Sequence, residues 1–326
     1  MGKKVTTKII HNGSDPSKHY GSINIPVYKN STLIFKNYRS FLEAKKNKFD
    51  LPYYGRINTN TTKNFAKVIT SLYNSKFTVL TSSGLSAITL TLKSFLKKND
   101  EVLITENCYE PVFNFAKNEL EKFGIKVHFY SNNCENLQNF INKKTKLIYV
   151  ESPSSLNFNV EDLVNISRIA KKYKLISVID NTWSTFLGCN PFNYGLDVVI
   201  ESATKYISGH SDNFLGISTT RSKIIYNKIK STAVRCGDFV SSESCYAAFN
   251  GLKTLKLRLE NHSKNALEIF KFLKSQTKIK DIKYPPDIMN KNHKLWKKYH
   301  SLSNGLITFS LTGNASIEKF IDNLKL

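Results

Sequence analysis

The sequence contains few cysteines, and these are scattered. There are five among 326 residues, an odd number, and none of them has C-x-x-C spacing. This usage is typical of reduced thiols and gives no sign of a disulfide framework or a zinc site. The seven histidines are equally dispersed, and the closest pair, His293 and His300, lies in a lysine-rich segment without ligand spacing. We therefore expect no metal.

Long apolar runs are also lacking. No stretch is long enough to span a bilayer. The N-terminus, MGKKVTTKIIHNGSDP, has lysines but not the apolar stretch of a signal peptide. These two absences predict a cytoplasmic protein without a membrane partner.

Acidic residues are scarce relative to basic ones. The chain has 25 Asp and Glu against 48 Lys and Arg, a net charge of +23. Such an excess is typical of nucleic-acid binding. The lysines, however, are spread along the whole chain without a dense basic arm or a known reader motif, and they accompany many Asn, Ile, Phe and Tyr, as AT-rich codons would produce. We expect no nucleic-acid partner, although the positive field would attract an anionic cofactor or substrate.

The chain does contain a regular alternation of short apolar runs and helical stretches, from about residue 77 to residue 202. This pattern predicts an α/β fold with a mainly parallel sheet and helices on both faces. The length suits one large domain and one smaller domain. We expect an extended N-terminal arm over residues 1–52, an α/β domain over 53–240 and an α+β domain over 241–326.

Two segments, LISVIDNTW and LDVVIESATKYISGH, each begin with a buried-strand pattern and end at reactive groups. The first ends at Asp180 and the second at Ser202, Thr204 and Lys205. Ligands of open α/β sheets bind at the carboxyl ends of strands. A pyridoxal 5′-phosphate (PLP) enzyme needs a lysine for the Schiff base and an acid for the pyridine nitrogen. The pattern thus predicts PLP, although Asp180 could also be an Asx-turn and Lys205 an ordinary exposed lysine.

Three further segments could hold a phosphate or a ring. Ser83-Gly84-Leu85 directly precedes a helix, where main-chain amides bind phosphate, although many helices are simply capped in this way. Tyr109 follows a strand and could stack on a flat cofactor, or be an ordinary tyrosine. Tyr54 and Arg56 could supply a hydroxyl and a guanidinium to phosphate, or be solvated loop residues.

Together these segments resemble the Cys/Met-metabolism family of fold-type I PLP-dependent enzymes, which includes cystathionine β-lyase, cystathionine γ-lyase, cystathionine γ-synthase and methionine γ-lyase. The resemblance runs from about His11 to the end of the chain. It rests on GSINIPVYKNSTLIF, YYGRINTNTT, SSGLSAI, NCYEPVFNF, ESPSSLNFNVEDL, IDNTWST and SATKYISGHSDNFLG.

The resemblance implies a fold-type I PLP-dependent transferase-like architecture and a role for each candidate. Lys205 would attach the cofactor, Asp180 would bind its pyridine nitrogen, and Tyr109 would stack on its ring and assist proton transfer. The phosphate would be held by Gly84, Leu85, Ser202 and Thr204, joined by Tyr54 and Arg56 of a neighbouring subunit. The family pattern therefore implies a homo-oligomer, a dimer of dimers.

Within the family, three segments are similar to cystathionine β-lyase: Tyr109-Glu110-Pro111, Trp183, and Ser154-Ser155-Leu156. They imply β-elimination of L-cystathionine to homocysteine, pyruvate and ammonia, as in methionine biosynthesis. The alternatives are another trans-sulfuration enzyme, namely a cystathionine γ-lyase, a methionine γ-lyase or a sulfhydrylase.

One feature departs from the family pattern. Family chains usually continue beyond the point that matches Leu326, and that part carries the arginine that binds the substrate α-carboxylate. Arg235 and Arg258 do not lie in that motif, and Asn250 and Lys253 stand where relatives often have arginines. We therefore expect an incomplete C-terminal domain, with a PLP-binding remnant without turnover as a further alternative.

Overall fold

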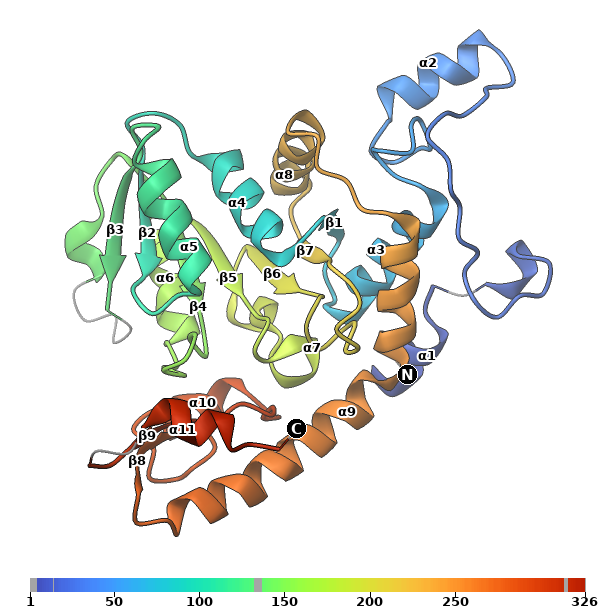
Figure 1. Cartoon of the computed structure of the whole chain (residues 1–326). Helices are drawn as coiled ribbons and strands as arrows, with labels where there is room; N and C mark the ends of the chain where they lie inside the picture. The colour runs from blue at the N-terminus through green and yellow to red at the C-terminus, as the bar shows by residue number, and fades with distance from the viewer. Residues whose placement is uncertain (1–4, 14, 132–136, 314–315, 326) are drawn as a thin grey trace.

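The computed structural model describes residues 5–13, 15–131, 137–313 and 316–325. Its centre is a seven-stranded sheet with the strand order β1-β7-β6-β5-β4-β2-β3 (Figure 1). The strands of this sheet are β1 Phe77–Thr81, β2 Glu101–Thr105, β3 Lys126–Tyr130, β4 Thr145–Glu151, β5 Ile176–Asp180, β6 Val198–Ser202 and β7 Gly216–Thr220.

The sheet is mainly parallel, as the sequence predicts. The neighbours β3, β2, β4, β5 and β6 all pair in parallel, and β7 pairs antiparallel with both β6 and β1. The pattern of apolar residues did not predict β7, because GISTT is rich in hydroxyl side chains even though all five residues are buried. Parallel pairing puts the carboxyl ends of β4, β5 and β6 at one edge of the sheet.

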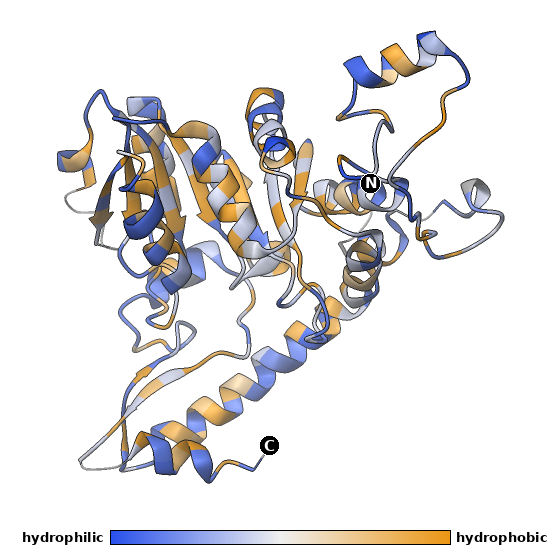
Figure 2. Cartoon of the chain, turned by 45° about the horizontal axis from the view of Figure 1, so that its top comes forward, coloured by the Kyte–Doolittle hydropathy of each residue, from blue (hydrophilic) through white to orange (hydrophobic). Residues whose placement is uncertain are grey.

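Helices cover both faces of the sheet. One face packs against α3, α6 and the first half of α9, and the other packs against α4, α5, the π-helix η2 and α8. Figure 2 shows the apolar residues concentrated on the strands and the inner sides of these helices. Each fully buried aliphatic side chain contributes roughly 1.5–3 kcal/mol. The helices are α3 Asn60–Leu72, α4 Gly84–Phe95, α5 Glu110–Phe115, η2 Ala116–Leu120, α6 Leu163–Tyr173, α8 Lys223–Arg235 and α9 Ser242–Lys274.

The N-terminal segment contains helices, which corrects the expectation of an extended arm. Helix α1 covers Val5–His11, a short 3₁₀ helix η1 covers Pro16–Lys18, and α2 covers Tyr38–Lys46. Asn37 and Ser40 form a capping box that fixes the start of α2. The sequence pattern missed α2 because Tyr38–Lys46 has only one fully buried residue, Ala44. Helix α2 projects away from the sheet (Figure 1).

The C-terminal segment begins with α9, a 33-residue helix that runs from the large core to a small second layer (Figure 1). That layer is a two-stranded antiparallel sheet with its own small cluster of Ala266, Phe270 and Tyr284. Its elements are β8 Ile279–Lys283, α10 His293–Tyr299, β9 Thr308–Leu311 and α11 Ile317–Asp322. The domain boundaries at 52/53 and 240/241 stay predictions.

Three short helices complete the described part of the chain: η3 Leu137–Phe140, α7 Thr185–Gly188 and η4 Pro191–Tyr194. No helix in the described ranges is both long enough and apolar enough to cross a membrane.

Candidate active site

The carboxyl ends of β4, β5 and β6 bring three polar side chains to one edge of the sheet. Glu151 and Asp180 are partners in the parallel register of β4 and β5. The amide of Ser202, the last residue of β6, donates a hydrogen bond of 2.8 Å to Thr182 Oγ1, two residues beyond β5. This bond fixes the end of β6 against the loop that follows Asp180.

Asp180 is a buried carboxylate, 8% exposed, and it has no salt-bridge partner among the described residues. The amide of Thr182 donates to Asp180 Oδ1 over 2.8 Å, so the Asx-turn geometry is present as well. Burial raises the pKa of Asp180, and the hydrogen bonds from Thr182 oppose that rise. A desolvated carboxylate without a counter-ion is suited to the protonated pyridine nitrogen of PLP.

Lys205 lies in a tight turn directly after β6. Its amide donates to the Ser202 carbonyl over 3.1 Å, and its own carbonyl accepts from the amide of Gly209 over 2.8 Å. The side chain is exposed, and its ammonium has no hydrogen-bond or ion-pair partner in the part of the chain that the structure describes. The main chain of Lys205 is thus held while its amine is available for a ligand.

Helix α4 begins directly beside Ser202. A Cβ atom added to Gly84 would lie 2.5 Å from Ser202 Cβ, so only glycine allows this close approach. The side chain of Ser83 caps the helix by accepting from the amide of Ser86 over 3.0 Å. The amides of Gly84 and Leu85 in the first turn have no partner among the described residues. These donors, next to the Ser202 hydroxyl, form a cradle that fits the cofactor phosphate.

Thr204 is the fourth candidate for the phosphate. Its Oγ1 accepts from the amide of Leu215 over 3.0 Å, which ties the turn after β6 to the segment before β7. The hydroxyl therefore already has one fixed hydrogen bond that orients it.

Tyr109 is connected to Asp180 through Glu151. The amide of Tyr109 donates to Glu151 Oε2 over 2.8 Å, while the Tyr109 side chain is 45% exposed. Burial raises the pKa of Glu151, and the charge of Asp180 raises it further. The structure thus brings Tyr109, Glu151, Asp180 and Ser202 to one edge, with Lys205 in the turn that follows.

The structure places Tyr54 and Arg56 elsewhere within the chain. Both are exposed, and Arg56 Nη1 donates to the carbonyl of Val234 over 2.8 Å. The structure holds one chain, so the expected contribution of these two residues to a neighbouring subunit stays a prediction.

Sequence reasoning missed Thr182, Glu151 and Asp238. Thr182 lies two residues after Asp180, and this spacing could have identified it. Glu151 ends a strand in the same way as Asp180 and carries the same signal. Asp238 contacts the start of α4 from 152 residues away in the sequence, and no local pattern could have identified it. Within the described residues, no cluster of His, Cys, Asp and Glu is arranged to hold a metal ion.

Beneath the same edge lies a second polar group that faces away from Asp180. Glu201, 1% exposed, accepts a hydrogen bond from the Tyr73 hydroxyl, which in turn accepts from Asn181 Nδ2 over 3.1 Å. Burial raises the pKa of Glu201 to about 8, against the opposing effect of the hydrogen bond from Tyr73. Glu201 therefore holds a proton at neutral pH.

Two curated relatives are similar to almost the whole chain. The L-alanine/L-glutamate racemase of Wolbachia pipientis is 32% identical and aligns with 98% of this chain and 82% of its own length. The cystathionine β-lyase of Lactococcus lactis subsp. cremoris is 31% identical, with the same two shares.

Solved structures give the same result. The cystathionine γ-lyase of Lactobacillus plantarum in complex with L-serine superposes with a TM-score of 0.92 at 26% identity, covering 99% of this chain and 82% of that one. A structure from Campylobacter jejuni superposes with a TM-score of 0.90 at 26% identity, covering 95% of this chain and 86% of that one, and it contains N′-pyridoxyl-lysine-5′-monophosphate.

The family model described as Cys/Met metabolism PLP-dependent enzyme matches residues 6–326. The fold, the polar groups at the ends of β5 and β6 and at the start of α4, and the relatives all agree with this match. The chain is therefore an enzyme that uses pyridoxal 5′-phosphate, and it belongs to the family of Cys/Met metabolism PLP-dependent enzymes.

Proposed function

We propose that this enzyme cleaves L-cystathionine by β-elimination and releases homocysteine, pyruvate and ammonia. The proposal is carried by the placement of Asp180 at the end of β5 and of Lys205 just after the adjacent strand β6. The chain also aligns over nearly its whole length with curated cystathionine β-lyases. The proposal includes a cytoplasmic homotetramer that acts in methionine biosynthesis.

The chemistry assigns a task to each residue. Lys205 would hold PLP through its amine, Asp180 would bind the pyridine nitrogen as a carboxylate, and the ring of Tyr109 would stack on the cofactor. PLP, when bound, draws electrons from the substrate Cα and so stabilises the negative charge that develops there. The amine of Lys205, when it is free, would accept the Cα proton as general base and would later return a proton. The amides of Gly84 and Leu85 hold the phosphate throughout and keep the cofactor oriented.

Trp183, one of the residues similar to cystathionine β-lyase, lies in the loop that follows Asp180. It is buried three residues beyond Asp180, and its ring lies 6.0 Å from that of His300, centre to centre. Asn304 Nδ2 donates to the Trp183 carbonyl over 2.9 Å. The C-terminal segment therefore packs directly against the loop that would border the substrate, and it can shape the specificity of the site.

Product analysis tests the proposal. The purified chain is loaded with PLP, its visible spectrum is recorded, and L-cystathionine is added. A β-lyase releases pyruvate with homocysteine, whereas a γ-lyase releases 2-oxobutyrate with cysteine. A yellow band followed by pyruvate is the expected result. The same band without any product would indicate a PLP-binding remnant and would refute turnover.

Lys205→Ala tests the assignment of the base. We expect turnover to fall by at least about 10²- to 10⁴-fold, since positioned general bases contribute on this order. Added methylamine should restore part of the rate in this variant if only the amine is missing. Unchanged turnover would refute the role of Lys205.

A second candidate function is amino-acid racemisation, because a relative at 32% identity is named L-alanine/L-glutamate racemase. Racemisation needs the same removal of the Cα proton but returns the proton to the opposite face instead of expelling a thiol. Incubation with L-alanine or L-glutamate, followed by chiral chromatography, separates the two reactions. Appearance of the D-enantiomer without pyruvate from L-cystathionine would favour the racemase.

A further inference from the structure

Asp238 lies at the start of α4, where the cofactor phosphate is expected. Its carboxylate accepts from the amide of Ser82 over 3.3 Å, from the Ser82 hydroxyl, and from the Ser86 hydroxyl over 3.0 Å. Ser82 directly precedes the N-cap Ser83, and Ser86 is the third residue of the helix. The carboxylate therefore spans the same first turn that presents the amides of Gly84 and Leu85.

The first turn of a helix attracts negative charge, because its amides lack partners and the helix dipole is positive there. The carboxylate of Asp238 already binds beside this positive first turn. A phosphate bound to the amides of Gly84 and Leu85 would meet this carboxylate at short range. Two such anions repel each other, and the repulsion is stronger beside a protein than in bulk water.

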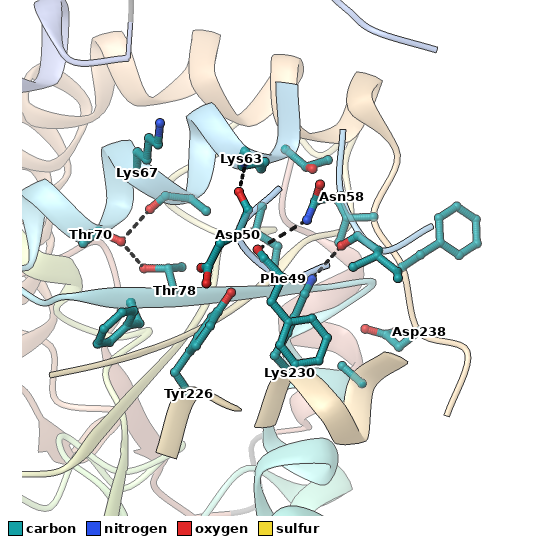
Figure 3. Close-up of a pocket in the computed structure, with 18 of the residues that line it drawn as sticks. Phe49, Asp50, Asn58, Lys63, Lys67, Thr70, Thr78, Tyr226, Lys230 and Asp238 are labelled. Atoms are coloured by element: carbon teal, nitrogen blue, oxygen red, sulfur yellow. Dashed lines mark hydrogen bonds between the residues drawn. The ribbon is translucent and has the colours of Figure 1, made fainter. Parts of the chain in front are cut away.

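Cationic side chains lie near the carboxylate of Asp238. Asp238 also lines a pocket of about 330 Å³ between α3, β1 and α8, together with Arg56 and Lys230 (Figure 3). Lys230 Nζ donates to the Ile57 carbonyl over 2.7 Å. Burial lowers the pKa of Lys230 to about 8, and the negative charge of Asp238 opposes that shift. The side chains near Asp238 are thus the hydroxyls of Ser82 and Ser86 and the amine of Lys230.

We propose that Asp238 competes with the cofactor phosphate for the first turn of α4, and that it turns towards Lys230 when PLP binds. The carboxylate then lowers the affinity of the enzyme for PLP and exchanges partners when the cofactor is loaded or lost. This inference rests on the proposed placement of the phosphate at Gly84 and Leu85. It assigns Asp238 a role in cofactor loading rather than in the reaction.

The test measures the affinity of the full-length apoenzyme for PLP, by titration of the visible band, in wild type and Asp238→Asn. Asparagine keeps the shape and an acceptor oxygen but removes the charge. We expect PLP to bind at least about tenfold more tightly to Asp238→Asn, the factor that about 1.4 kcal/mol of relieved repulsion produces. Asp50→Asn is the matched control, because Asp50 lines the same pocket but pairs with Lys223 and makes no contact with α4.

Pyridoxal, which lacks the phosphate, is the control on the ligand side. Its affinity should be the same in Asp238→Asn and wild type, because no second anion approaches α4. An affinity for PLP that is unchanged or weaker in Asp238→Asn would overturn the competition. An equal gain for pyridoxal would also overturn it, since the effect would then not come from the phosphate.

Two further variants keep the test decisive. Asp238→Ser removes the charge with a smaller side chain, and it should tighten PLP binding as well if Asp238→Asn does not fold. Thr204→Ala tests the placement of the phosphate itself and should weaken PLP binding. If Thr204→Ala weakens binding while both Asp238 variants leave it unchanged, only the competition fails. If Thr204→Ala has no effect, the proposed phosphate site fails.

Discussion

The two sides of the sheet edge at β5 and β6 hold buried carboxyl groups in opposite situations. On the cofactor side, Asp180 has hydrogen bonds from Thr182 but no cation in the described chain. On the other side, Glu201 is enclosed by the core and bonded to Tyr73, which also binds Asn181. The two residues lie on adjacent strands, so the same strand ends position both.

Burying a negative charge is unfavourable for both Asp180 and Glu201, and the two residues differ in how this is avoided or compensated. Glu201 keeps a proton, because burial raises its pKa to about 8. Asp180 has a raised pKa as well, and in the proposed cofactor site a cationic ring nitrogen would stabilise its charge. The comparison indicates that Glu201 needs no ligand in order to stay buried, whereas Asp180 would gain its missing partner from the proposed cofactor.

The largest effect is expected from Asp180→Asn, which removes the negative charge on the proposed cofactor side. Without the negative charge the ring nitrogen loses its proton, and kcat should fall on the order of 10²- to 10³-fold, as when one preorganised electrostatic group is removed. Steady-state assay of pyruvate release from L-cystathionine measures the loss.

Asp197→Asn is the control for Asp180→Asn. Asp197 precedes β6 at the opposite end of the same strand pair, where it accepts from the amide of Ser177 over 2.9 Å. The kcat of Asp197→Asn should stay within a few-fold of wild type. An equal loss in both variants would show that the effect of Asp180→Asn is structural.

Glu201→Ala removes the buried carboxyl group on the other side, and it should lower stability rather than catalysis. It leaves a cavity and removes the acceptor of the Tyr73 hydroxyl, which together cost about 2–4 kcal/mol of unfolding free energy. Urea denaturation of the apoenzyme measures this. Glu201→Gln keeps the acceptor and should cost less. A large fall in PLP affinity without loss of stability would contradict the separation of the two sides.

The sequence signals for the proposed cofactor side are local. Asp180 directly follows a run of Ile and Val, Lys205 comes three residues after the end of β6, and Gly84 stands at the first position of a helix with clear periodicity. The parallel sheet followed from the same runs. Each of these features depends on residues within about ten positions of one another.

The remaining features depend on contacts between distant segments. Glu201 reads as an ordinary strand residue until Tyr73, 128 positions earlier, is placed beside it. Asp238 lies in a loop with no motif, and only the fold brings it to Ser82 and Ser86. Strand β7 was missed because its burial comes from both neighbouring strands and not from its own apolar content.

The most specific effect concerns the pH dependence of stability, which Glu201→Gln isolates. A carboxyl with an ordinary pKa of 4.5 in the unfolded chain and about 8 in the fold binds more protons when folded between these values. The contribution of Glu201 to stability is therefore complete below about pH 4.5, and it is lost as the pH rises towards 8, at up to about 1.4 kcal/mol per pH unit. Glutamine does not titrate, so wild type should lose more stability than Glu201→Gln between about pH 5 and about pH 8.

Asp180 and Glu151 titrate in both proteins, and their effect largely cancels in the difference. Urea denaturation of the two apoenzymes across this range measures it. Parallel curves would show that Glu201 is already ionised in the fold and would remove the distinction between the two sides.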